Sequence, residues 1–182
     1  MKAIFLFFAS VSAAGLVLSA ASHIAAVLGT QGPLGNFAFV LHIGIFVVWI
    51  PAVFAANRLV RNVPRKDFWK AALRGCPDWM KYMTYAFVGY AILNFAFFIS
   101  SAPTQGRGGP MSPEDVRGFS GHWMAFYSAA LAILYSAAQV WDERERHCPN
   151  GHEVQPLAKF CDQCGQPVGY LAQPQSGPFS RS

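Results

Sequence analysis

Charged side chains are scarce in this sequence. Of its 182 residues only 13% are Asp, Glu, Lys or Arg, whereas 53% are hydrophobic and 15% are aromatic. Soluble domains carry about 25% charged residues, so the composition excludes an ordinary soluble globular protein and indicates an integral membrane protein. The lipid bilayer is therefore the first partner that the sequence predicts.

Motifs of enzymatic chemistry are missing as well. The chain contains no phosphate-binding loop, no dinucleotide-binding fingerprint, no nucleophile elbow and no internal repeat. Because no set of catalytic residues can be named, the sequence gives enzymatic activity no positive support. Whether the protein is an enzyme stays open at this point.

Four apolar stretches make up most of residues 1–141 and predict an all-α membrane domain. A helix rises about 1.5 Å per residue, so about 20 apolar residues cross the hydrocarbon layer. The expected spans cover about residues 3–28, 36–60, 79–100 and 119–141. A cleaved signal peptide over residues 1–21, with Lys2 as its basic start, is the alternative for the first span.

Basic residues gather between the second and third spans. Residues 58–81 contain seven Lys or Arg side chains and two acidic ones. The positive-inside rule places such a loop in the cytoplasm, so both termini of a four-span protein in the cell membrane are also expected there. Within the loop, a short amphipathic helix with Trp69 on its apolar face is expected to lie on anionic headgroups.

Two features of the later spans predict how the helices associate. Small residues recur at intervals of three and four in the fourth span, which permits close helix contact, and Asn94 inside the third span needs a partner on a neighbouring helix. Before the fourth span, Ser112-Pro113-Glu114-Asp115 is typical of a helix start. We expect this start in the outer loop, where it would cap the bundle.

Only four cysteines occur, and three of them lie in the tail. Cys148 is followed at the fourth position by His152, and after eight intervening residues come Cys161 and Cys164. Three thiolates and one imidazole in two close pairs suit a tetrahedral zinc ion. Four protein ligands leave no open position for water or substrate, so this zinc would be structural.

The second pair, Lys159-Phe160-Cys161-Asp162-Gln163-Cys164-Gly165, resembles the second knuckle of the short zinc-ribbon modules at the ends of many prokaryotic proteins. The first pair departs from that pattern, because His152 stands one position after the place of the missing cysteine. His147, beside Cys148, is the competing ligand. The resemblance covers residues 147–168 only, and it implies a small zinc-stabilised ribbon used for contacts rather than for catalysis. Residues 170–182 are rich in Ser, Pro and Gln and predict a disordered tail.

Three histidines fall at similar depths near the outer ends of their spans: His23, His42 and His122. Ionisable residues inside membrane segments are candidates for function. Imidazoles on facing helices could ligate haem b or hold a metal ion. The alternative is that each histidine forms separate hydrogen bonds near the interface.

The sequence thus predicts a four-helix membrane bundle with a C-terminal zinc ribbon that mediates protein contacts or regulation at the cytoplasmic face. The first alternative is a haem b or metal-binding membrane redox protein that uses the three histidines. A membrane-tethered nucleic-acid binder is less favoured, because the ribbon has one lysine, Lys159, and no basic stripe.

Overall fold

A computed structural model describes the chain except for residues 31, 62, 101–111, 141–146, 155–157 and 169–182. The tail predicted to be disordered, residues 170–182, lies outside the described residues. Within them the secondary structure is helical, with two isolated β-bridges near the C-terminal end and no regular strand.

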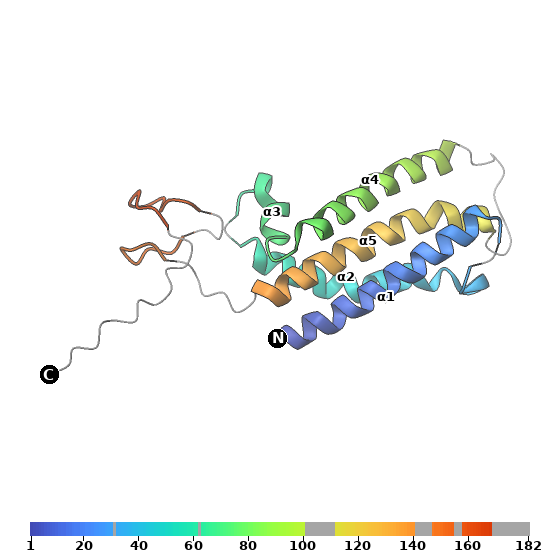
Figure 1. The fold of residues 1–182 in the computed structure, drawn as a ribbon, viewed down its shortest axis with the longest axis horizontal. Helices are drawn as coiled ribbons and strands as arrows, with labels where there is room; N and C mark the ends of the chain where they lie inside the picture. Colours follow the sequence, from blue (N-terminus) through green and yellow to red (C-terminus); the bar gives the residue numbers. More distant parts are fainter. Residues whose placement is uncertain (31, 62, 101–111, 141–146, 155–157, 169–182) are drawn as a thin grey trace.

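Four helices are long and apolar enough to cross a membrane, as predicted. They are α1 (Lys2–Val27), α2 (Val40–Leu59), α4 (Asp78–Ser100) and α5 (Pro113–Val140), and the short 3₁₀ helix η1 (Gly35–Phe37) precedes α2. The four run alongside one another (Figure 1), and the N-terminus lies at the same end of the bundle as α3 (Phe68–Ala72) and the end of α5.

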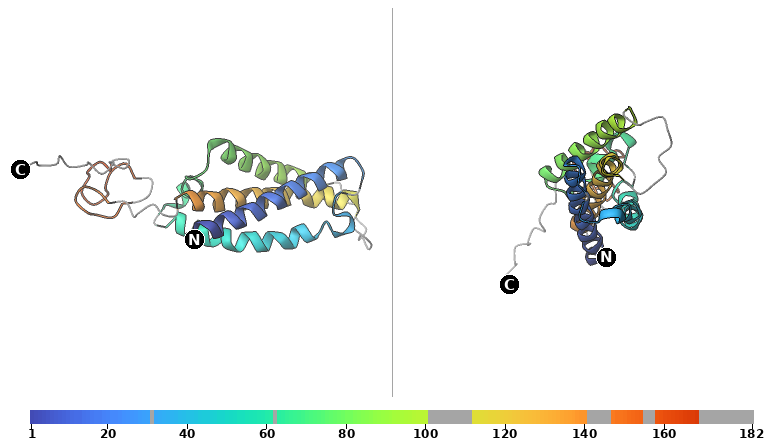
Figure 2. Two further views of the ribbon diagram at one scale, coloured as in Figure 1. Left: turned by 60° about the horizontal axis from the view of Figure 1, so that its bottom comes forward. Right: turned by 90° about the vertical axis from the view of Figure 1, so that its right-hand side faces the viewer.

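Helix α5 is the centre of the bundle, because each of the other long helices packs against it. Figure 2 shows α1, α2 and α4 arranged around it. In the most apolar stretch of α5, 78% of the residues are buried, against 17% in α4. Small side chains make this position possible, since alanine, serine and glycine let neighbouring backbones come close. Buried members of this set in α5 are Gly118, Ser120, Gly121, Ala125, Ser128, Ala129, Ala130, Ala132, Ser136, Ala137 and Ala138.

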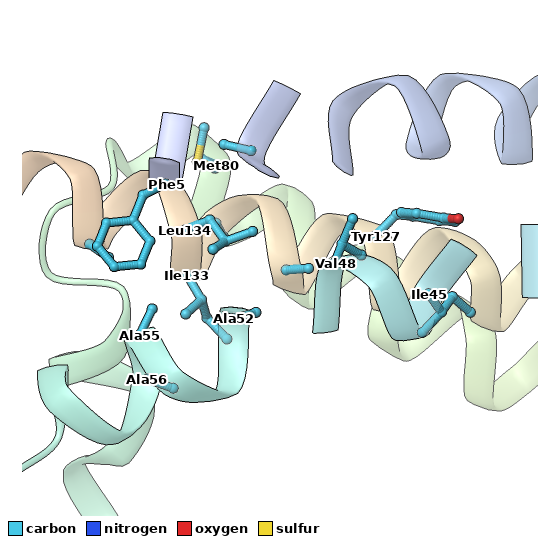
Figure 3. Packing of buried hydrophobic residues seen from close by; sticks show 14 of the residues in the cluster. Phe5, Ile45, Val48, Ala52, Ala55, Ala56, Met80, Tyr127, Ile133 and Leu134 are labelled. Carbon is cyan, nitrogen blue, oxygen red and sulfur yellow. The ribbon is translucent and has the colours of Figure 1, made fainter. Parts of the chain in front are cut away.

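Larger side chains fill the gaps between these small ones. Figure 3 shows Val48 and Ala52 of α2 beside Ile133 and Leu134 of α5. Val48, Ala52 and Leu134 are fully buried. The contact between α2 and α5 is therefore apolar around these four residues.

Tyr127 of α5 contacts both α1 and α2. Its hydroxyl donates a 2.9 Å hydrogen bond to the Leu41 carbonyl of α2. The ring lies against Gly15 of α1, and the hydroxyl lies against Gly44 of α2, so closely that a Cβ atom at either glycine would overlap Tyr127. Both positions therefore need the smallest residue because of space, not because of backbone conformation.

The outer surfaces of α1, α2 and α4 are strongly apolar. Exposed side chains there include Phe7, Val17, Phe54, Ile92 and Leu93, each more than 60% exposed. Such a continuous apolar surface is unfavourable in water. It fits the hydrocarbon of a bilayer, and it supports the prediction of a membrane protein.

The basic loop folds back onto the bundle through α3 and the 3₁₀ helix η2 (Arg65–Asp67). Ala71, Ala72 and Leu73 are buried, and Arg74 donates a 2.8 Å hydrogen bond to the Leu59 carbonyl at the end of α2. Trp69 is 43% exposed, whereas Ala71 and Ala72 of the five-residue helix α3 are buried. The expected contact of this helix with anionic headgroups stays a prediction.

Two details of α5 and α4 refine the sequence expectations. Asn94 does bond a neighbouring helix, since its Nδ2 donates to the carbonyls of Arg117 and Gly118 at 2.9 and 3.1 Å.

The expected helix start at Ser112 is correct, but it opens α5 itself and not a separate loop helix. There the Asp115 carboxylate accepts from the Ser112 amide at 3.0 Å, while the Ser112 hydroxyl accepts from the Asp115 amide at 3.2 Å. This reciprocal pair satisfies donors that every helix start leaves free.

Candidate metal centre

The first half of the candidate centre is a tight turn between Cys148 and His152. The Gly151 amide donates to the Cys148 carbonyl at 2.8 Å, and the Cys148 amide donates to the His152 carbonyl at 2.9 Å. Gly151 has a φ of +82°, a left-handed conformation that favours glycine. An isolated antiparallel bridge between His147 and Glu153 closes the turn.

The second half repeats this design. The Gly165 amide donates to the Cys161 carbonyl at 2.8 Å, and the Cys161 amide donates to the Gln166 carbonyl at 2.8 Å. Gly165 has a φ of +70°, and a bridge between Phe160 and Pro167 closes this turn. Each pair therefore lies in a tight turn whose glycine has a left-handed conformation.

A small apolar cluster joins the two turns. Val154 and Val168 are buried with Cys148 and Cys161, and Ala158 packs against them. This cluster is too small to hold a fold of its own, because so few side chains remove little apolar surface from water. A metal ion held between the two turns would supply a further cross-link.

The turns bring four ligand atoms together. The Sγ atoms of Cys148, Cys161 and Cys164 and the imidazole of His152 offer ligand atoms that all lie within 4.8 Å of one another. Cys148 Sγ is 3.6 Å from both Cys164 Sγ and His152 Nδ1, and Cys161 Sγ is 3.7 Å from that Nδ1.

These separations fit a tetrahedral zinc ion. With bonds of about 2.3 Å to sulfur and 2.0 Å to nitrogen, two sulfur ligands lie about 3.8 Å apart and a sulfur and a nitrogen about 3.5 Å apart. The predicted ligands Cys148, His152, Cys161 and Cys164 thus form a set that could hold a metal ion such as zinc. His147, the competing ligand, is outside this set and exposed.

Backbone hydrogen bonds favour the thiolate form at one of the cysteines, Cys148. Burial by itself raises the pKa of the Cys148 thiol, but hydrogen bonds from the backbone of His152 and Asn150, together with the neighbouring thiols, lower it to about 7. Burial dominates at Cys161 and raises the pKa of that thiol. Amide donors to thiolates orient the ligands and tune their charge.

The three candidate histidines of the membrane helices do not form one group. His23 Nδ1 is 2.7 Å from Ser120 Oγ, and His23 Nε2 is 2.5 Å from the Tyr90 hydroxyl. Since Ser120 donates its hydroxyl hydrogen to the Arg117 carbonyl at 3.2 Å, it accepts from His23, and Tyr90 donates to the other nitrogen. Both nitrogens of His23 are thus engaged, and they join α1 to α4 and α5.

The other two histidines do meet. His122 Nε2 is 3.3 Å from His42 Nδ1, and Trp123 Nε1 donates to the same Nδ1 at 3.2 Å. A haem iron between two axial nitrogens needs them about 4 Å apart, with bonds of about 2 Å on each side. The facing nitrogens are too close for that arrangement, and in the described part of the chain nothing supports a haem.

Sequence reasoning missed the partners of these histidines. Tyr90 and Ser120 hold His23, and Trp123 holds His42. A polar partner for Trp123 could have been predicted from the sequence, because an indole N–H buried inside a membrane span needs a hydrogen-bond acceptor. Tyr90 carries no such signal, since tyrosine is common along membrane helices near the interface.

Comparisons of this chain with protein-family models, with curated proteins and with solved structures gave no match. The class of protein is therefore defined by its own features. They are four helices able to span a membrane and a Cys₃His cluster able to hold a metal ion.

Proposed function

We propose that this chain is a multi-pass membrane protein whose C-terminal module, residues 147–168, binds one structural zinc ion. In this proposal the module is a zinc ribbon, it lies in the cytoplasm, and it contacts a protein partner at the membrane surface. The zinc has a folding role only, because four protein ligands leave no coordination position for a substrate.

The observation that carries the proposal is the convergence of four ligand atoms within 4.8 Å. Three thiols crowded into such a small volume gain little from one another, since a thiol is a weak donor and a weak acceptor. A zinc ion turns the same geometry into a cross-link worth on the order of 10 kcal/mol. A reducing compartment is required to keep the thiols from forming disulfides, which agrees with the cytoplasmic face predicted from the basic loop.

Phe160 supports a role in protein contacts. Its side chain is 64% exposed although it directly precedes the ligand Cys161. Large exposed aromatic residues held rigidly on a surface are typical anchors of protein interfaces. The zinc ion would fix the backbone that presents this ring.

Site-specific photo-crosslinking in cells tests the proposal. A benzophenone amino acid at position 160 is expected to give discrete protein adducts, which should disappear when Cys161→Ser removes a zinc ligand. The same probe at Phe54, a 71% exposed residue of α2, is the control and should react with lipid only. Unchanged adducts at position 160 in the Cys161→Ser background would contradict a zinc-dependent contact.

A further inference from the structure

The three thiols of the tail differ in how easily a reagent dissolved in water reaches them. Cys148 and Cys161 are only 5% and 2% exposed, and they are buried together with Val154 and Val168. Cys164 is half-buried, and its neighbours in the chain on both sides are exposed. A small oxidant in the surrounding water therefore meets the Cys164 thiol first.

The second thiol that such an oxidant would involve is Cys148. Its Sγ lies 3.6 Å from Cys164 Sγ, although the two residues belong to different turns. A disulfide bond is about 2.05 Å long, so the two sulfur atoms need to approach by about 1.5 Å. Rotation of the two side chains can supply such a movement. The resulting bond would connect the two turns directly.

Loss of these two sulfur ligands would leave too few for the ion. Only Cys161 and His152 of the four ligands would remain, and a structural zinc site needs four protein ligands. Phe160, the exposed ring next to Cys161, would then no longer sit on a backbone fixed by the ion. The presence of zinc and the presentation of Phe160 are linked in this way.

We propose that the metal centre is a redox switch that hydrogen peroxide opens. Oxidation joins Cys148 to Cys164 in a disulfide, releases the zinc ion and ends the protein contact made through Phe160. This inference rests on the proposed function, because it requires both the bound zinc and the contact that the zinc supports.

The chemistry needs one peroxide molecule per disulfide. Bound zinc keeps the thiols deprotonated, and the thiolate is the form that peroxide oxidises. The Cys164 thiolate attacks one oxygen of the peroxide, the O–O bond breaks, and a sulfenic acid forms as hydroxide leaves. The Cys148 thiolate then attacks this sulfur, the S–O bond breaks, and a second hydroxide leaves as the disulfide forms. The two sulfur atoms lose two electrons to the peroxide, and two protons convert the hydroxides to water.

The switch is reversible. A dithiol reductant attacks the disulfide by thiol exchange, becomes a disulfide itself and returns two electrons to the tail. The restored thiols of Cys148 and Cys164 can then bind zinc again. Reversal separates this process from oxidation to sulfinic acid, which dithiols do not reduce.

The first experiment uses the purified full-length protein in lipid nanodiscs. Elemental analysis gives the zinc content before any treatment. Hydrogen peroxide is then added, a chromophoric indicator follows the released zinc, and mass spectrometry of peptides identifies the disulfide. The expected result is one zinc ion released for each disulfide between Cys148 and Cys164, with rebinding after addition of dithiothreitol and zinc.

The outcomes separate this proposal from the proposed function. Protein that contains no zinc before treatment would overturn the proposed function and the switch with it. Zinc-loaded protein that keeps its ion in peroxide would overturn the switch alone. Zinc release with a disulfide between Cys161 and Cys164, or with sulfinic acid and no disulfide, would also overturn it.

A variant tests the role of the accessible thiol. Cys164→His keeps four possible ligands but removes that thiol, so peroxide should release zinc at least about tenfold more slowly. Cys76→Ser is the matched control, because this buried thiol outside the tail should not affect the rate. Equal rates in Cys164→His and the original protein would contradict the proposal. The mapping of the disulfide uses the unmodified protein and does not depend on this variant.

The regulatory part is tested in cells with the photo-crosslinking probe at position 160. Brief treatment with peroxide should remove the protein adducts, and they should return after the peroxide is washed out. In the Cys164→His background the adducts should persist during the treatment. Adducts that persist in the original protein while its zinc centre is oxidised would overturn the link between the switch and the contact.

Discussion

In the proposed zinc site, His152 is the ligand that departs most from the zinc-ribbon pattern, and it would supply the only nitrogen atom. Its Nδ1 lies 3.6 Å from Cys148 Sγ and 3.7 Å from Cys161 Sγ, whereas His147 is outside the cluster. We expect His152→Ala to lower zinc affinity by about 10- to 100-fold or more, because the ion loses a direct ligand. His147→Ala is the matched control and should keep the affinity of the original protein. Competition with a chromophoric chelator measures both, and a larger loss from His147→Ala would contradict the assignment.

Cys76 is a thiol that should behave differently from those of the tail. It lies between α3 and α4, its Sγ donates to the Ala132 carbonyl at 3.0 Å, and burial raises its pKa from 9.0 to about 11. Because the thiolate is the reactive form, alkylation by iodoacetamide at pH 8 should be about 100-fold slower than in a cysteine peptide. Mass spectrometry of the zinc-loaded protein measures the rate at this residue. Modification at the rate of the peptide would show that the thiol is accessible and ionised.

The same shift has a consequence for stability. The folded state favours the protonated thiol of Cys76, since its folded pKa is raised above the unfolded value. The stabilisation is therefore fully present below about pH 9 and is lost as the pH rises towards 11. The rate of alkylation should increase over the same range of pH.

Individual residues also show where sequence reasoning succeeds and where it fails. The grouping of Cys148, His152, Cys161 and Cys164 could be predicted, because two close pairs separated by a short arm can bring their side chains together. The pairing of His42 with His122, and the separate place of His23, could not be predicted, because equal depth in a membrane leaves the rotation of each helix undetermined. That rotation is set by contacts such as those of Tyr127 with Gly15 and Gly44.

At the scale of the helices, the close contact between Gly44 of α2 and Tyr127 of α5 allows the packing of these two helices to be tested. A Cβ atom at Gly44 would overlap the hydroxyl of Tyr127 but would meet its ring carbon Cζ at an ordinary 3.6 Å. We expect Gly44→Ala to destabilise the bundle by about 1–3 kcal/mol, because the hydroxyl is held by the Leu41 carbonyl and cannot move freely. Thermal unfolding in detergent measures the loss.

A double variant separates this clash from other causes. Tyr127→Phe removes the obstructing oxygen, so adding Gly44→Ala to it should cost much less than in the original protein. Gly89→Ala in α4 is the control, since a Cβ there meets nothing within 4 Å, and it should be neutral or slightly stabilising. Equal costs of Gly44→Ala with and without the tyrosine hydroxyl would contradict this account of the contact.

The helices themselves were the most predictable part of the molecule. Runs of more than 20 apolar residues determine where α1, α2 and α4 lie to within a few residues, because length and hydropathy together decide a span. Helix α5 begins at Pro113, before the apolar span expected from residue 119. Its start could be predicted from a different signal, the proline and the acidic residues Glu114 and Asp115 in its first turn.

For the whole molecule, the charge distribution predicts the orientation in the membrane. Residues 58–81 carry seven basic and two acidic side chains, so this loop should stay in the cytoplasm together with both termini. Reporter enzymes inserted at Pro64 or fused after Ser182 should report the cytoplasm, whereas one inserted at Gly108 should report the outside. An outside signal after Ser182 would place the tail in an oxidising compartment and would remove the basis for zinc binding by reduced thiols.

The central claim is that the tail of this membrane protein holds one zinc ion through three sulfur atoms and one nitrogen atom. Two measurements on the purified full-length protein test this claim directly. Elemental analysis gives the zinc content, and X-ray absorption at the zinc edge gives the atoms bound to the ion. The account predicts close to one zinc per chain, with three sulfur neighbours at about 2.3 Å and one nitrogen neighbour at about 2.0 Å. A protein purified without stoichiometric zinc, or zinc surrounded mainly by oxygen and nitrogen, would contradict it.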